Sequence, residues 1–201
     1  MHSLSKEIRN DPVLRALAKK YGPVQWRETK RPFHALVSAI IYQQITGTAA
    51  ASIQKRFRAL YGGRMPSPKA LAATPAEKLR TAGVSPQKAR YLHDLAAHFA
   101  SGVRRERMLA DMTNDEIIAQ LTRVKGVGVW TVHMFLLFTL RRPDILPTLD
   151  LGIKKGFQIA YGLRALPTHA QMERIARPWR MHASVASWYL WRAADEAKRA
   201  R

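Results

Sequence analysis

The segment Lys125-Gly126-Val127-Gly128 joins a cation to two glycines directly before an apolar stretch with helical spacing. Glycines permit a tight turn between two helices, and the helix that follows leaves the N–H groups of its first turn without intrahelical partners. Such a helix start binds a phosphate, and Thr131 can add a hydroxyl hydrogen bond from the first turn. A plain interhelical turn is the alternative, because glycine commonly ends helices. On its own the segment predicts a grip on a phosphate backbone and no reading of bases.

Asp150 is the second feature with chemical capacity, because it follows a loop that contains Pro143 and Pro147 and precedes a predicted helix. An aspartate in such a position accepts backbone N–H hydrogen bonds as an N-cap. A carboxylate held in a fixed position can also stabilise positive charge that develops in a reaction, or take a proton from water. Both roles can belong to the same side chain.

The composition excludes several other chemistries. The chain has no cysteine, so it has no disulfide, no iron–sulfur cluster held by thiolates and no cysteine-ligated zinc. Its acidic and histidine residues do not cluster with the spacing of metal ligands, which leaves little support for a metal-dependent nuclease.

The charge balance indicates a polyanionic partner. The 201 residues include 34 Lys and Arg against 14 Asp and Glu, a formal net charge of +20, and so large an excess attracts polyanions. The basic residues recur through a chain that is 47% hydrophobic and has 5 tryptophans, so they do not form a disordered tail. Charge that serves solubility alone, or a membrane surface, is the weaker alternative.

Apolar residues return at helical spacing and strand patterns are nearly absent, so the sequence predicts an all-α fold. At this length the chain should form one domain or two small lobes. A helix opened by Pro32 carries one apolar face, made of Phe33, Leu36, Val37, Ile40 and Ile41. A second helix should run from Thr46 to Leu60, which leaves Tyr42-Gln43-Gln44-Ile45 at the joint.

Further helices are predicted over residues 87–99, 114–123, 130–140, 153–161, 168–176 and from about 178 to the basic end. Ser67 and Ser85, each followed by proline, are N-cap candidates, and Thr74 with Glu77 has the spacing of a capping box. The N-terminus lacks the apolar run of a signal peptide and no stretch reaches transmembrane length, which predicts an intracellular, soluble protein.

Several blocks of the chain form a recognisable series. They are residues 33–46 (FHALVSAIIYQQIT), 83–92 (GVSPQKARYL), 121–134 (LTRVKGVGVWTVHM) and 142–154 (RPDILPTLDLGIK), followed by Pro178-Trp179-Arg180 and Trp188-Tyr189. In this order and spacing, over about residues 30 to 195, they resemble the helix-hairpin-helix (HhH-GPD) DNA glycosylase superfamily. Within it, the sequence is most similar to the 3-methyladenine DNA glycosylase II family.

The resemblance implies a two-lobed helical fold over residues 1–201, with the helix-hairpin-helix motif at about 114–140 and the active site in the cleft between the lobes. The middle lobe would cover about 32–142, and the second lobe about 1–31 together with 143–201. The implied activity is base excision repair by a DNA glycosylase. Such an enzyme flips an alkylated base, of the 3-methyladenine or 7-methylguanine type, hydrolyses its N-glycosidic bond and leaves an abasic site.

Asp150 matches the catalytic aspartate of the family, which would stabilise positive charge on the sugar and orient or deprotonate the attacking water. The family usually has two consecutive acids here, and Leu149 replaces the first, so a carboxylate that could help to orient Asp150 is missing. Relatives that also nick the backbone have a lysine nucleophile where this chain has Trp130. The resemblance therefore implies a monofunctional enzyme without lyase activity.

Trp130 and Trp188 match aromatic pocket positions of the family, whose ring faces suit a flipped, positively charged purine. Packing in the core is the alternative for Trp188. Met134 and Leu151 fall where some relatives have pocket tyrosines. His133 could also point into the cleft, although a lone histidine on a helix more often packs or faces solvent.

The family fills the hole left by the flipped base with a side chain from the joint between its early helices. Gln44 is the candidate for this wedge and Gln43 for its hydrogen-bonding neighbour, and ordinary polar loop residues are the alternative.

The implied partner is double-stranded DNA that contains damaged bases, bound by a monomer that associates with DNA in the cytoplasm or nucleoid if the source is prokaryotic. No organic cofactor and no catalytic metal are implied, although carbonyl groups of the hairpin could hold a structural monovalent cation. One alternative is a non-catalytic helix-hairpin-helix DNA-binding protein, which the presence of Asp150 disfavours. A glycosylase for deaminated or oxidised bases is another, disfavoured by Trp130 and by the absence of a thiolate cluster.

Overall fold

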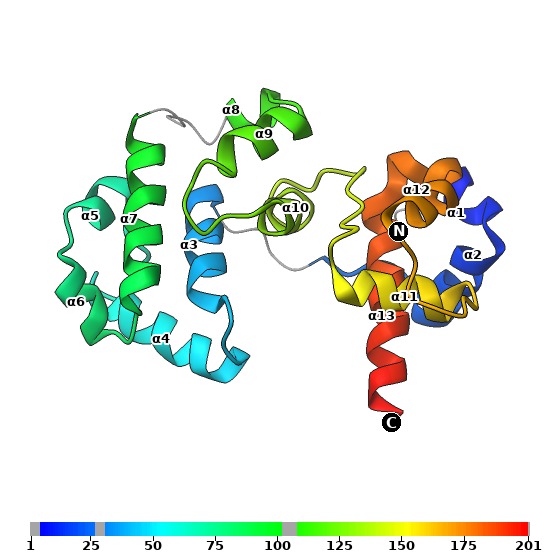
Figure 1. The fold of residues 1–201 in the computed structure, drawn as a ribbon, viewed down its shortest axis with the longest axis horizontal. Coiled ribbons are helices and arrows are strands. Elements are labelled where there is room, and N and C mark those ends of the chain that lie inside the picture. Colours follow the sequence, from blue (N-terminus) through cyan, green and yellow to red (C-terminus); the bar gives the residue numbers. More distant parts are fainter. Residues whose placement is uncertain (1–4, 27–30, 102–107, 201) are drawn as a thin grey trace. The chain divides into compact units, whose positions relative to one another are not determined.

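The computed structural model describes residues 5–26, 31–101 and 108–200, and across these ranges the regular elements are helices without any strand (Figure 1). The all-α prediction is therefore confirmed. The chain divides into two compact units, one made of Met1–Glu28 with Leu136–Arg201 and the other of Thr29–Phe135. The second boundary falls inside helix α10, Val129–Phe138, rather than after residue 142. A cleft between the units stays a prediction.

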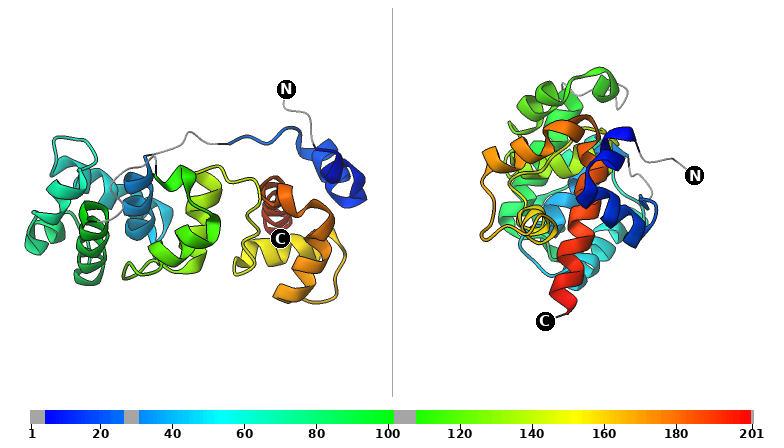
Figure 2. Two further views of the ribbon diagram at one scale, coloured as in Figure 1. Left: turned by 90° about the horizontal axis from the view of Figure 1, so that it is seen from above. Right: turned by 90° about the vertical axis from the view of Figure 1, so that its right-hand side faces the viewer.

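The unit formed by the two chain ends is built from α1 Lys6–Asn10, α2 Pro12–Tyr21, α11 Leu151–Ala160, α12 His169–Ala176, the 3₁₀ helix Arg177–His182 and α13 Ala183–Arg199. Figure 2 shows α2, in blue, beside α13, in red, although nearly the whole sequence separates them. Leu14 from α2, Phe157 from α11 and Leu190 from α13 meet in its core and have no exposed surface. This packing holds the element that carries Asp150.

The start of the terminal helix differs from the prediction. Residues 177–182 form a 3₁₀ helix with a kink at Trp179, whose φ is −121°, and the α-helix begins only at Ala183. The indole of Trp179 is fully buried and donates a hydrogen bond to Asp11 Oδ2 over 3.2 Å. Tyr161 donates a second one to the same oxygen over 3.0 Å. The burial of Trp179 and its bond to Asp11 thus accompany the break in the helix.

Helices α11 and α13 lie side by side because Gly156 presents no side chain between them (Figure 1). A Cβ atom built on Gly156 would lie 2.4 Å from the carbonyl oxygen of Leu190, so only glycine lets the two backbones approach this closely.

The other unit contains α3 Pro32–Tyr42, α4 Gly47–Ala59, α5 Pro68–Ala72, α6 Ala76–Thr81, α7 Pro86–Ser101, α8 Met108–Asp111, α9 Asn114–Leu121 and the first part of α10. In Figure 1, α7 passes between α3 and the pair α5 and α6, and it packs on all three. The apolar face predicted for 33–41 is confirmed, since each of its five residues is at most 2% exposed. Helix α7 therefore forms the centre of this unit.

Two of the three predicted helix caps are present. Ser67 Oγ accepts from Ala70 N over 3.1 Å and Ser85 Oγ accepts from Lys88 N over 3.3 Å. The capping box predicted for Thr74 and Glu77 is wrong, because α6 starts one residue late and its N-cap, Pro75, makes no side-chain cap. The buried Thr74 hydroxyl instead donates to Ala70 O and accepts from Tyr61 OH, both over 2.8 Å.

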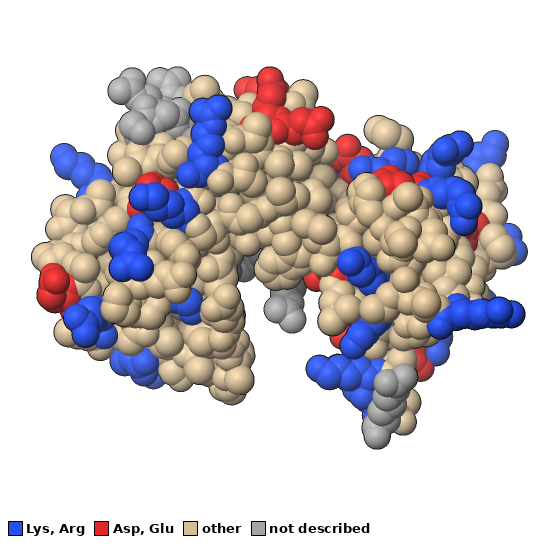
Figure 3. All heavy atoms as spheres, viewed as in Figure 1, with Lys and Arg blue, Asp and Glu red and all other residues tan. Residues whose placement is uncertain are grey.

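Basic side chains are scattered over both units on the face drawn in Figure 3, as expected when the excess is spread along the chain.

Within the described part of the chain, no helix combines the length and the apolar character that crossing a membrane requires.

Candidate functional site

Asp150 lies at the N-terminus of α11 and caps it, as the sequence predicts. Its backbone is extended, with φ −76° and ψ 124°, and its Oδ1 accepts a hydrogen bond from Ile153 N over 2.8 Å. The same oxygen accepts a second one from Trp191 Nε1 of α13, also over 2.8 Å. The partly buried carboxylate is therefore held by two N–H donors from two helices.

The loop that leads to Asp150 is attached to α13 by two serines. Ser184 Oγ donates to Arg142 O over 2.6 Å and accepts from Ile145 N over 3.1 Å. Ser187 Oγ donates to Ile145 O over 3.3 Å. Since residues 184, 187 and 191 recur on one face of a helix, α13 binds both the loop backbone and the Asp150 carboxylate with a single stripe of side chains.

Gly152 makes room for this arrangement. A Cβ atom at this position would lie 2.9 Å from Asp150 Oδ1 and 2.9 Å from Trp191 Cδ1, distances at which side chains must move apart. Glycine at 152 is thus needed for the indole to reach the carboxylate.

A line of aromatic rings supports Trp191. Its ring stacks on Phe138, with centroids 5.5 Å apart and an interplanar angle of 23°, and Phe138 meets the edge of Trp26 at 6.4 Å. The Arg141 guanidinium lies over Trp26 at 5.1 Å, and burial lowers the pKa of this group from its ordinary value. The rings leave Trp191 little freedom to rotate away from Asp150.

Hydrophobic side chains flank the carboxylate on the surface. Leu149 is 59% exposed and Leu151 is 55% exposed, one on each side of Asp150 in the sequence. Trp188 is half-buried, and the Arg192 guanidinium lies 5.5 Å from its ring centre. Trp188 therefore makes a cation–π contact with a residue one turn further along α13.

The glycine hairpin is present between α9 and α10 and is anchored to α7. Gly126 has a φ of +79°, and a Cβ atom there would lie 2.2 Å from Cδ2 of Tyr91. The main-chain N–H of Lys125 donates to Asp94 Oδ2 over 2.8 Å. Tyr91 and Asp94 are one turn apart on α7, so this helix fixes the shape of the hairpin.

The predicted DNA-binding residues of the hairpin differ in exposure. Lys125 and Gly128 are exposed, and a Cβ atom at Gly128 would meet nothing within 4 Å. Val127 is 3% exposed, and its N–H closes the turn on Val124 O over 3.0 Å. Thr131 is only 6% exposed, so little of its side chain reaches the surface, and its hydrogen bond to a phosphate stays a prediction.

The joint between α3 and α4 is bound to the same hairpin. Gln43 Nε2 donates to Gly126 O over 2.8 Å, and Gln44 is exposed with a φ of +56°. Lys88 Nζ donates to Ile41 O over 2.7 Å and to Gln43 O over 2.8 Å, and burial lowers the pKa of Lys88. Gln44 is a non-glycine residue with a left-handed backbone, which is a strained conformation. Backbone strain of this kind is concentrated at functional sites.

The remaining predicted pocket residues lie on α10. Trp130 is 44% exposed at its start, while His133 and Met134 are partly buried. These three belong to the unit Thr29–Phe135, whereas Asp150, Leu151 and Trp188 belong to the other unit. The candidate site residues therefore form two groups, each with a defined geometry within its own unit.

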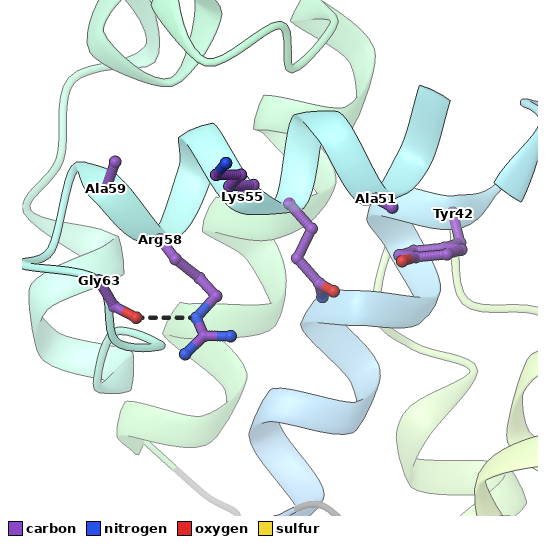
Figure 4. Close-up of a pocket in the computed structure, with 7 residues that line it drawn as sticks. Tyr42, Ala51, Lys55, Arg58, Ala59 and Gly63 are labelled. Atoms are coloured by element: carbon purple, nitrogen blue, oxygen red, sulfur yellow. Dashed lines mark hydrogen bonds between the residues drawn. The ribbon is translucent and has the colours of Figure 1, made fainter. Parts of the chain in front are cut away.

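A surface pocket of about 360 Å³ lies along α4 (Figure 4). Its lining comes from residues 42–63 and includes Lys55 and Arg58, whose Nε donates to Gly63 O over 2.9 Å. Its lining contains no acidic residue. Among the described residues no group of three His, Asp or Glu side chains is placed to hold a metal ion.

Sequence reasoning missed Trp191 and Gly152 as parts of the Asp150 site. The glycines at 152 and 156 are four residues apart, just before and within the helix predicted over 153–161, and this spacing could have indicated the contact with another helix. Nothing in the local sequence indicated that the partner would be Trp191.

The sequence is similar to those of known DNA repair proteins. The family model described as HhH-GPD superfamily base excision DNA repair protein matches residues 37–181. DNA-3-methyladenine glycosylase 1 of Schizosaccharomyces pombe is 34% identical over 186 residues, which are 90% of this chain and 80% of that protein.

Solved structures that are similar to this chain over nearly its whole length include two 3-methyladenine glycosylases. DNA-3-methyladenine glycosidase from Bacillus halodurans gives a TM-score of 0.89 at 33% identity, covering 97% of this chain and 92% of that one. The 3-methyladenine DNA glycosylase of Schizosaccharomyces pombe in complex with abasic DNA gives a TM-score of 0.81 at 30% identity, covering 94% of this chain and 96% of that one.

Proposed function

The chain belongs to the HhH-GPD superfamily of base excision DNA repair proteins, and on this basis we propose that it is a DNA glycosylase that releases alkylated bases of the 3-methyladenine and 7-methylguanine type from double-stranded DNA. The observation that carries the proposal is the Asp150 carboxylate, held at the start of α11 by Ile153 N and Trp191 Nε1. The similarity to two 3-methyladenine glycosylase structures supports the choice of alkylated bases.

In the proposed reaction the N-glycosidic bond breaks and its electron pair passes to the base. An alkylated purine carries a positive charge, so it leaves as a neutral molecule and no strong general acid is required. Positive charge develops on the sugar, where the fixed Asp150 carboxylate stabilises it. The oxygen of a water molecule then bonds to the sugar carbon, and its proton passes to Asp150. The products are a free base and an abasic site.

We assign recognition of the flipped base to Trp130 and Trp188, with Met134, Leu151 and His133 as neighbours. The exposure of Trp130 supports this assignment, because an electron-rich ring attracts a cationic purine more than a neutral one. The pocket has fewer aromatic residues than some relatives, so its range of substrates is set by apolar contact as much as by stacking.

We assign the grip on the DNA backbone to the hairpin, with Lys125 as the cation and the first-turn amides of α10 as donors. The open space next to Gly128 supports close approach of a phosphate. Gln44 would enter the duplex as the wedge, with Gln43 tied to the hairpin behind it. The exposed, left-handed backbone of Gln44 supports this role.

The enzyme is proposed to act as a monofunctional monomer at the cell's DNA, without an organic cofactor. With Trp130 in place of a lysine nucleophile, no Schiff base can form at that position, and borohydride should trap no covalent complex with damaged DNA. Two hairpin carbonyls, those of Val124 and Gly126, already accept hydrogen bonds from Val127 N and Gln43 Nε2. A monovalent cation bound to such carbonyls would be structural, and no reaction step involves it.

The proposal is tested by incubating the wild-type protein and the Asp150→Asn variant with methylated duplex DNA and identifying the released bases by chromatography. Wild-type protein should release alkylated bases, and the variant should release them at least about 100-fold more slowly, since it lacks the charge that stabilises the transition state. Equal release by both proteins, or none by the wild type, would overturn the proposal. Retained duplex binding without base release would favour a non-catalytic DNA-binding protein.

A further inference from the structure

We infer that Trp191 is a positioning residue for catalysis, whose indole N–H fixes the Asp150 carboxylate in the orientation that the reaction needs. The inference rests on the proposed function and extends it to a residue of α13 outside the base pocket. It also supplies an orienting group at a site where Leu149 replaces the acid that the family usually has before the catalytic aspartate.

The two donors to Asp150 constrain it more than an ordinary helix cap does. A cap provides one hydrogen bond, here from Ile153 N, and leaves the carboxyl group able to rotate about that contact. The second bond, from Trp191 Nε1, reaches the same oxygen from a different helix. Hydrogen bonds to a charged oxygen are about twice as strong as neutral ones, so together the two donors hold Oδ1 of Asp150 in place.

The indole is itself held in place on several sides. Phe138 stacks on its ring, and Gly152 leaves the space between the indole and the carboxylate open. Ser184 and Ser187, on the same face of α13, bind the loop that ends at Asp150. Helix α13 therefore carries the donor, Trp191, and also binds the loop that ends at the acceptor, Asp150. Preorganised sites require such support.

Loss of this hydrogen bond should lower the rate of base release, because a carboxylate that is free to leave the correct orientation stabilises the transition state less well. Misplacement of a catalytic group by about 1 Å lowers a rate by about 100-fold. Removing the indole donor while keeping an aromatic ring should therefore lower the rate of base release by about 10- to 100-fold, without changing how tightly DNA is bound.

Trp191→Phe tests the inference, because phenylalanine keeps the stacking on Phe138 and lacks the N–H donor. The rate of 7-methylguanine release is measured under single-turnover conditions with enzyme in excess, and affinity for an abasic-site duplex is measured by fluorescence anisotropy. The expected result is a rate about 10- to 100-fold lower with an affinity within about twofold of the wild type. Gly152→Ala should give the same pattern, because its Cβ separates the indole from the carboxylate.

Trp179→Phe is the matched control, since it removes an indole donor from the other capping aspartate, Asp11. It should lower the melting temperature and leave the single-turnover rate of the folded protein within about twofold of the wild type. Tyr161→Phe removes another donor to Asp11 with a smaller change in volume and serves if Trp179→Phe folds poorly.

A spectroscopic measurement tests the hydrogen bond without relying on glycosylase activity. The indole N–H resonance of Trp191, identified by its loss in Trp191→Phe, should move upfield in Asp150→Ala. An unmoved resonance, or a Trp191→Phe rate within twofold of the wild type, would overturn the inference. Failure of the wild type to release any base would instead overturn the proposed function and the positioning role with it, while the resonance would still report on the contact.

Discussion

Replacing Gly126 by alanine should destabilise the protein through two effects that the structure separates. The φ of +79° at this position is left-handed, and a residue with a Cβ atom adopts it at a cost of about 1–2 kcal/mol. The added Cβ would also lie 2.2 Å from Cδ2 and 2.4 Å from Cε2 of Tyr91, and forcing an extra group into packed surroundings costs about 1–3 kcal/mol. The expected loss in the free energy of unfolding is therefore about 2–5 kcal/mol.

Gly128→Ala is the control two residues away. Its Cβ would meet nothing within 4 Å, and its φ is not left-handed, so stability should stay within about 0.5 kcal/mol of the wild type. Both variants should bind duplex DNA more weakly. Gly126→Ala distorts the hairpin, whereas Gly128→Ala places a methyl group where a phosphate is expected to approach the backbone.

Urea unfolding followed by tryptophan fluorescence measures the stabilities, and fluorescence anisotropy with a labelled duplex measures the binding. Measured against Tyr91→Ala alone, the double variant Tyr91→Ala with Gly126→Ala should lose only the part due to φ, because the steric contact is absent from that background. If Gly126→Ala is as stable as the wild type, or if Gly128→Ala loses as much, the argument from the Tyr91 contact and the left-handed backbone is refuted.

Three further predictions concern other parts of the structure. Gln44→Ala should weaken binding to an abasic-site duplex more than binding to an intact duplex, because only the first has a hole to fill, and equal losses would contradict the wedge role. Lys88→Met should lower the free energy of unfolding by about 1–3 kcal/mol, because two partly buried carbonyls at the end of α3 lose their donor; unchanged stability in urea would argue against this. Lys20 donates a hydrogen bond to Glu196 and holds the pKa of that carboxyl below its ordinary value of 4.5. This pair therefore stabilises the fold fully at a pH above 4.5, and the stabilisation is lost as the pH falls through the lowered pKa. The melting temperature of Glu196→Gln should therefore approach that of the wild type on acidification, and a constant gap between them would exclude the linkage.

Features that depend on local sequence could be predicted well. The apolar face of α3 follows from the spacing of its residues, and its burial is confirmed. The hairpin and the cap at Asp150 follow from glycines at a turn and from an acid before a helix, since both use contacts within a few residues of the chain.

Features that depend on distant contacts could not be predicted. Thr74 has the spacing of a cap, yet its hydroxyl is used by Tyr61 and Ala70, and only the fold brings Tyr61 to it. The start of the terminal helix is a 3₁₀ segment because Trp179 is anchored to Asp11, 168 residues away in the sequence. The contact of Trp191 with Asp150 spans 41 residues, so no window of local sequence contains both partners.

The division of the chain into a continuous unit and one made from its two ends has a consequence for the order of folding. The elements proposed to grip DNA lie within Thr29–Phe135, so their contacts can form as soon as that stretch of chain exists. The surroundings of Asp150 require α13, because Ser184 of this helix is bound to Arg142, 42 residues earlier in the chain. Helix α13 in turn packs on α2, near the other end of the chain. Contacts between distant residues form slowly, since a long loop must close before they are gained. We therefore expect the grip on DNA to be assembled before the reactive carboxylate, so that a partly folded chain can hold DNA before it can cleave a base from it.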